Sequence, residues 1–127
     1  MKNVFITSAL RTAVGSLGKS LKNVCAEDLG SIVISNVIKS SNIISKDVDE
    51  VIMGQVLTGG SGQNPARQAA VKSGVPIEKP AYCVNQVCGS GIRSVVSGFQ
   101  SIKSGSSNVV VAGGQENMSL APHAIHL

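Results

Sequence analysis

Residues 81–105, AYCVNQVCGSGIRSVVSGFQSIKSG, combine a short apolar run, a glycine-rich turn and an amphipathic pattern. The run at 81–87 predicts a strand. From 89 to 104, apolar residues recur at the spacing of one helix face, and Gly105 is a typical residue for ending a helix. The residues of that face are Ile92, Val95, Val96, Phe99 and Ile102. The stretch therefore predicts a strand–turn–helix unit, the building block of parallel α/β sheets.

The same alternation extends over the rest of the chain. We expect further strands near 3–9, 50–57 and 108–113, and further helices near 26–40 and 64–73. Asn64 is a good cap for the second of these helices, and Pro65 suits its first position. The order β-α-β-α-β-α-β predicts an α/β fold with three layers, a mainly parallel sheet with helices on both faces.

Composition agrees with a sheet that is buried on both faces. The chain has 127 residues, of which 43% are hydrophobic and only 2% aromatic, so the core must consist of Val, Ile, Leu and Ala. The net charge of +4 is mild and the basic residues are scattered, which argues against a nucleic-acid partner. No secretory signal or membrane-spanning stretch is found in the sequence, so we expect a cytoplasmic protein with no membrane partner.

Cys88 is the candidate catalytic residue. It lies in the run Val87-Cys88-Gly89-Ser90-Gly91, which places its thiol on the first turn of the third predicted helix. A helix N-terminus favours the thiolate, which is the nucleophilic form of cysteine. The two glycines leave the thiol open to a bulky electrophile, as covalent catalysis requires. The alternative is a small buried cysteine followed by a glycine-rich turn.

The remaining cysteines and histidines predict no further site. Cys25 and Cys83 form no Cys-x-x-Cys pair with each other or with Cys88, which favours a reducing compartment. His123 and His126 do not complete a metal-ligand set, so we expect no metal. Glu116 follows the fourth predicted strand, where it is either a functional polar group or a structural acceptor; we favour the structural role.

Four segments of the sequence together resemble the N-terminal part of thiolases. They are Arg11-Thr12-Ala13-Val14-Gly15, Gly62-Gln63-Asn64-Pro65-Ala66-Arg67-Gln68-Ala69-Ala70, Asn85-Gln86-Val87-Cys88-Gly89-Ser90-Gly91 and Gly113-Gly114-Gln115-Glu116-Asn117-Met118-Ser119. The following Ala121-Pro122-His123 is similar to the bacterial biosynthetic acetyl-CoA acetyltransferase type. The resemblance covers essentially the whole chain, in order.

The resemblance implies an acyltransferase activity. Thiolases condense two acetyl-CoA molecules to acetoacetyl-CoA or run the reverse thiolysis, and their partners are therefore acetyl-CoA, acetoacetyl-CoA and CoA. The resemblance implies that Cys88 is the nucleophile that takes the acyl group as a thioester, and that its backbone N–H forms part of an oxyanion hole. No metal or organic cofactor is implied, because the coenzyme A thioesters are substrates.

The chain also departs from the family pattern, because thiolases are much longer. Residues 1–119 correspond to an incomplete N-terminal half, and residues 120–127 to the truncated start of a loop domain. The Gly-His-Pro and Cys-x-Gly-Gly-Gly runs, which carry the family's base and acid/base groups, are absent from the sequence. We therefore expect the isolated chain to be inactive and to pair with a C-terminal thiolase half or with copies of itself. Family dimers pair the strand that corresponds here to 81–87.

Two alternatives stay open beside a thiolase fragment. The chain could be a non-catalytic α/β domain, a partner-binding or relic form derived from a thiolase. A ketoacyl synthase relative of the same fold is less favoured, because those enzymes share the nucleophilic cysteine but not the pair of runs NPARQAA (64–70) and VCGSG (87–91).

Overall fold

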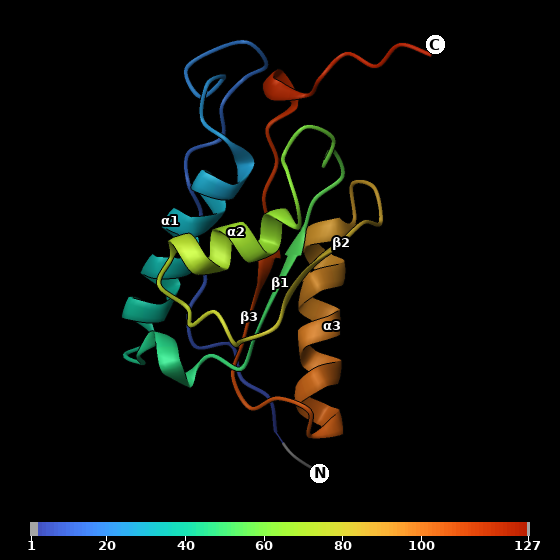
Figure 1. Cartoon of the computed structure of the whole chain (residues 1–127). Helices are drawn as coiled ribbons and strands as arrows, with labels where there is room; N and C mark the ends of the chain where they lie inside the picture. Colours follow the sequence, from blue (N-terminus) through green and yellow to red (C-terminus); the bar gives the residue numbers. More distant parts are fainter. Residues whose placement is uncertain (1–2, 127) are drawn as a thin grey trace.

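A three-stranded parallel sheet forms the centre of the computed structural model, which describes residues 3–126 (Figure 1). Residues 1 and 2 of the predicted N-terminal half (1–119) and residue 127 of the predicted loop-domain start (120–127) lie outside the described part. The strands are β1 (Glu50–Gly54), β2 (Ala81–Val84) and β3 (Val110–Gly114), in the order β2-β1-β3. The α-helices are α1 (Ala26–Ser40), α2 (Pro65–Lys72) and α3 (Ser90–Ser104), and two short 3₁₀ turns are η1 (Ser45–Asp47) and η2 (Met118–Leu120).

The helices cover both faces of the sheet. Alternate side chains of a strand point to opposite faces. Val51 and Met53 of β1 belong to the core shared with α1 and α2, whereas Gly54 of the same strand lies against Ser90 of α3. The three predicted layers are therefore present, with α1 and α2 on one side and α3 on the other.

The main core lies between the sheet and the two helices α1 and α2. It is aliphatic, as the composition predicts, and it consists of Ile34, Ile38, Val48, Val51, Met53, Ala66, Ala69, Ala70, Val75 and Ala81. Small residues allow α1 and α2 to approach closely, since a Cβ on Gly30 would lie 3.3 Å from the Ala69 Cβ. The start of α2 follows the prediction, with Pro65 at its first position and the Asn64 side chain accepting the Arg67 N–H at 3.1 Å.

The strand predicted at 3–9 is absent. Residues 3–9 follow an extended path outside any sheet, and Phe5 and Ile6 are 77% and 80% exposed. A strand needs a neighbour that accepts its ladder of hydrogen bonds, and this segment instead contacts the cap residue that follows α1, through Thr7 Oγ1 and Ser41 Oγ at 2.9 Å. Figure 1 draws the segment as a dark-blue coil without a strand arrow. The prediction was wrong because strand-like composition alone does not make a segment pair with a sheet.

A groove of about 790 Å³ lies beside this N-terminal segment. Its walls come from residues 4–17, from β3 and from the apolar faces of α1 and α3. Within residues 3–126, β3 pairs only with β1, so its outer edge faces this groove with unpaired backbone groups.

The other three strands are where the sequence predicts them, but two of them end early. β1 stops at Gly54 rather than at 57, because the N–H groups of Val56 and Leu57 turn to the Glu116 carboxylate. β2 stops at Val84 rather than at 87, because the Val87 N–H donates to Asn85 Oδ1 at 3.0 Å. In both cases a side-chain acceptor replaces the neighbouring strand.

Helix α3 packs on the sheet through its small residues and not through its apolar stripe. Its buried positions are Ser90, Ser94 and Gly98, and a Cβ on Gly98 would lie only 3.0 Å from Val110. The residues Ile92, Val95, Val96 and Phe99, called here the α3 stripe, are 38–74% exposed, and Val95 and Phe99 line the groove. The pattern correctly predicts the helix, but the apolar side of α3 is not the side that this chain buries.

Candidate active site

The carboxyl ends of the three strands are tied to one another directly. The Gln55 N–H donates to the Val84 carbonyl at 3.1 Å, and the Gln115 N–H donates to the Gly54 carbonyl at 2.9 Å. The residues that follow β1, β2 and β3 therefore meet at one edge of the sheet. In open parallel sheets this is the edge at which functional groups gather.

Cys88 lies at this edge, between the end of β2 and the first residue of α3. Its side chain is exposed, so the buried-cysteine alternative from the sequence is wrong. Within residues 3–126 the Cys88 N–H donates no hydrogen bond, whereas the Gly89 N–H donates to the Gln86 carbonyl at 3.0 Å and the Ser90 N–H to the Val87 carbonyl at 3.1 Å. The loop thus presents both a thiol and a backbone donor to the surface.

The loop that carries Cys88 is strained at Val87. This residue has φ 51°, in the left-handed region, which a β-branched side chain rarely adopts. The Val87 N–H is held by Asn85 Oδ1, and the Val87 carbonyl accepts the Ser90 hydroxyl at 2.6 Å. Such a conformation persists only where the surroundings fix it, and it is found most often at functional sites.

The candidate site is open rather than enclosed. Besides the groove described above, a smaller hollow of about 420 Å³ lies beside Cys25 and the loop 59–62. Cys88 lines neither of them. A substrate bound at Cys88 would therefore need further walls that this part of the chain does not provide.

Glu116 has the structural role that the sequence analysis favours. Its carboxylate accepts the Val56 N–H at 2.8 Å and the Leu57 N–H at 3.3 Å, which holds the segment after β1 against the segment after β3. Asn117 acts in a similar way on the loop before α1, because its side-chain amide donates to the carbonyls of Leu21, Lys22 and Val24.

The two other cysteines differ from Cys88 in their surroundings. Cys83 is part of β2, and its sulfur accepts the Ala66 N–H at 3.3 Å. Burial raises the pKa of the Cys83 thiol above its ordinary value, and the charge of Glu116 acts in the same direction. Cys25 is partly buried and precedes α1 without a side-chain capping bond. Neither Cys83 nor Cys25 lies in the loop between β2 and α3 that carries Cys88.

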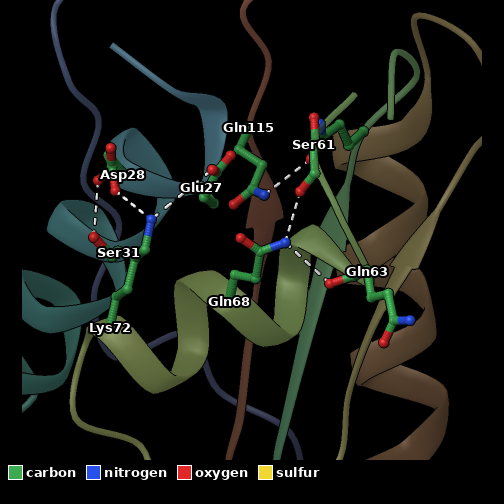
Figure 2. A network of polar contacts seen from close by, with 9 residues as sticks. Glu27, Asp28, Ser31, Ser61, Gln63, Gln68, Lys72 and Gln115 are labelled. Carbon is green, nitrogen blue, oxygen red and sulfur yellow. Dashed lines mark hydrogen bonds and ion pairs between the residues drawn. The ribbon is translucent and has the colours of Figure 1, made fainter. Parts of the chain in front are cut away.

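A polar network fixes the glycine-rich loop that follows β1 (Figure 2). Gln68 of α2 donates to the carbonyls of Ser61 and Gln63 at 2.7 and 3.0 Å. On the next turn, Lys72 pairs with Asp28 at 2.6 Å and with the mostly buried Glu27 at 3.8 Å, which joins α2 to α1. Figure 2 also shows Gln115 beside this network. These contacts are architectural, because they fix the loop and join the two helices.

Sequence reasoning missed the residues that shape the Cys88 loop. They are Gly54, which faces the first turn of α3, and Ser90, which is only 4% exposed and hydrogen-bonds to both Gln86 and Val87. The only signals were a glycine inside the strand pattern EVIMG and a serine two positions after the cysteine. No group of His, Cys, Asp and Glu able to hold a metal occurs among residues 3–126, and no helix there is long and apolar enough to cross a membrane.

Comparison with known proteins places this geometry in a family. The acetyl-CoA acetyltransferases of Cupriavidus necator and Escherichia coli are each 53% identical to the chain over 125 residues, which is 98% of the chain and 32% of each relative. The crystal structure of the Bacillus anthracis acetyl-CoA acetyltransferase matches with a TM-score of 0.92 and 37% identity, over 95% of the chain and 31% of that protein.

A thiolase from Ascaris suum, solved in complex with coenzyme A, matches with a TM-score of 0.86 and 38% identity, over 87% of the chain and 29% of that protein. The chain thus spans about a third of the length of its relatives. The family model for the thiolase N-terminal domain matches residues 4–126. The chain therefore belongs to the thiolase family, and residues 4–126 match its N-terminal domain.

Proposed function

We propose that the chain is the N-terminal part of an acetyl-CoA acetyltransferase and that Cys88 is its acyl-accepting nucleophile. The observation that carries the proposal is the position of Cys88, exposed in a strained loop between a strand end and the first turn of α3. Cysteine nucleophiles are typically activated at such helix N-termini. The family match over residues 4–126 supplies the reaction class.

The proposed chemistry is transfer of an acyl group between thiols. The Cys88 thiolate attacks the 3-keto carbonyl of acetoacetyl-CoA, the bond between C2 and C3 breaks, and Cys88 keeps the terminal acetyl group as a thioester while the enolate of acetyl-CoA takes up a proton and leaves. The thiol of a second CoA then takes the acetyl group from Cys88. The N–H of Cys88, which donates no hydrogen bond within residues 3–126, is suited to stabilise the oxyanion of each step.

Three features support the view that the rest of the enzyme is needed. The α3 stripe is exposed, the groove at the β3 edge is unfilled by residues 3–126, and Cys88 lines neither hollow. Apolar surfaces of this kind mark contacts with other protein. We propose that the remaining two thirds of a thiolase cover the stripe and complete the substrate pocket. The coenzyme A bound by the Ascaris suum thiolase is consistent with coenzyme A thioesters as substrates.

A partner-binding domain without catalysis is the second candidate, and the exposed α3 stripe favours it to the same extent. The two candidates differ in what happens at Cys88. In an enzyme, replacement of Cys88 abolishes turnover without affecting assembly, whereas a binding domain never supports turnover at all.

The experiment combines the chain with the missing part of a relative. The 127-residue chain is co-expressed with the remaining C-terminal part of the Cupriavidus necator relative, and thiolysis of acetoacetyl-CoA is followed in the purified complex. We expect no turnover from the chain alone, turnover from the complex, and none from the complex that carries Cys88→Ala. Cys25→Ala serves as the matched control and keeps turnover. A complex that assembles but is inactive would favour the binding domain, and turnover that survives Cys88→Ala would refute the proposed nucleophile.

A further inference from the structure

The Ser90 hydroxyl makes two hydrogen bonds across the Cys88 loop. Its Oγ accepts the Gln86 N–H at 2.9 Å and donates to the Val87 carbonyl at 2.6 Å. Gln86 and Val87 precede Cys88 in the chain, and Ser90 follows it. The side chain is nearly inaccessible, with 4% exposure, so water does not readily replace either bond.

The conformation of Val87 explains why these hydrogen bonds are needed. A β-branched residue at φ 51° is unfavourable and relaxes toward extended backbone unless it is held. Two groups hold the Val87 carbonyl, the Ser90 hydroxyl and the Ser90 N–H. Loss of the hydroxyl would also leave the Gln86 N–H without its acceptor. Relaxation at Val87 would rotate the next residue, Cys88, away from the start of α3.

We propose that Ser90 is a positioning residue for the nucleophile, and that its hydroxyl holds Val87 in the left-handed conformation that places Cys88 at the N-terminus of α3. The inference rests on the proposed role of Cys88. Ser90 itself does not touch the reacting atoms; it acts through the backbone of Gln86 and Val87.

Ser94 offers a matched control on the same helix. It is fully buried, one turn after Ser90, and its hydroxyl lies 2.7 Å from the carbonyl oxygens of Gly91 and Gly113, to either of which it can donate. Ser94→Ala therefore removes a buried hydroxyl of equal size from the contact between α3 and the sheet. It leaves the bonds of the Cys88 loop in place.

The test measures alkylation of Cys88 by iodoacetamide in the full 127-residue chain, with peptide mapping and with Cys25 as internal reference. We expect Ser90→Ala to slow Cys88 by about tenfold, as misplacement of a reacting group does, while Cys25 keeps its rate. Ser94→Ala leaves the Cys88 rate unchanged even where it lowers the melting temperature. Glycine tolerates positive φ, so Val87→Gly added to Ser90→Ala restores the Cys88 rate.

Equal effects of Ser90→Ala and Ser94→Ala on Cys88, or no recovery with Val87→Gly, would overturn the positioning role and leave the proposed function standing. A wild-type chain in which Cys88 reacts no faster than Cys25 would overturn both. If Ser90→Ala does not fold, Ser90→Thr replaces it, because threonine keeps the hydroxyl. A folded Ser90→Thr chain is expected to keep the wild-type rate, and a tenfold fall there would contradict the inference.

Discussion

The backbone of Gly54 at the end of β1 lies directly against the backbone of Ser90 at the start of α3. A Cβ on Gly54 would be 2.3 Å from the Ser90 carbonyl carbon and 2.5 Å from the Gly91 nitrogen. Both neighbours are backbone atoms, so neither can rotate away. The close contact places the first turn of α3, and with it the Cys88 loop, immediately beside the central strand of the sheet.

Gly54→Ala is expected to displace the start of α3 and to lower the free energy of unfolding by about 1–3 kcal/mol, the usual cost of overpacking. Gly113→Ala is the control, because a Cβ there would meet only the flexible Met53 side chain at 3.9 Å. Urea unfolding of the two variants measures the difference. Equal stability of the two variants would mean that α3 moves away from β1 at little cost.

The predictable part of the fold comes from local signals that tertiary structure leaves intact. Asn64, Pro65 and Gly105 mark helix ends through their own conformational preferences, so the helices fall within one residue of the predicted ranges. β1, β2 and β3 also lie where apolar runs predict strands, because these runs find a neighbour in the sheet.

The predictions that failed concern which segments pack or pair with one another, and a local sequence pattern does not specify this. The run at 3–9 resembles a strand but does not pair with the open edge of β3, which faces it across the groove. Helix α3 contacts the sheet through Ser90, Ser94 and Gly98, because these small residues allow a closer approach than its apolar side. At the candidate site the sequence predicts Cys88 near the start of α3, but the structure places it just before the cap residue Gly89 and so ahead of the first turn, not on it. The strain at Val87 and the Ser90 hydrogen bond that holds it could not be predicted, since both arise from the precise path of the backbone.

Phe99→Ser tests whether the α3 stripe is an interface. Phe99 is 49% exposed, so we expect the substitution to change the free energy of unfolding of the isolated chain by only about 0.5 kcal/mol, as for other surface positions. It should nevertheless weaken co-purification with the C-terminal thiolase part. Ile34→Ala, at a residue with 1% exposure, should cost about 2–5 kcal/mol in the same chain. A large loss of stability with Phe99→Ser would place the stripe inside the fold of this chain.

Glu116→Ala tests the structural role of this carboxylate. The change removes the acceptor of the Val56 and Leu57 N–H groups, and it should lower the free energy of unfolding by about 1–3 kcal/mol. Glu116→Gln keeps an acceptor and should cost less, while Glu78→Ala, at an exposed glutamate, should cost little. Chemical unfolding is measured together with alkylation of Cys88. A stable Glu116→Ala chain with altered Cys88 reactivity would instead indicate a functional group.

The free energy of unfolding should decrease at alkaline pH because of the Cys83 thiol. Burial is the main cause that raises the pKa of this thiol above its ordinary value of 9.0. Between the two pKa values the unfolded chain binds fewer protons than the folded chain, so the free energy of unfolding decreases as pH rises through this range. Below the unfolded pKa the contribution of Cys83 to stability is fully present.

We expect Cys83→Ala to flatten the dependence of the free energy of unfolding on pH, measured by urea unfolding at neutral and alkaline pH. Tyr82→Phe should act only at higher pH, because burial also raises the pKa of Tyr82 from its ordinary value of 10.0. An unchanged alkaline slope in Cys83→Ala would show that this thiol titrates alike in the folded and unfolded chain.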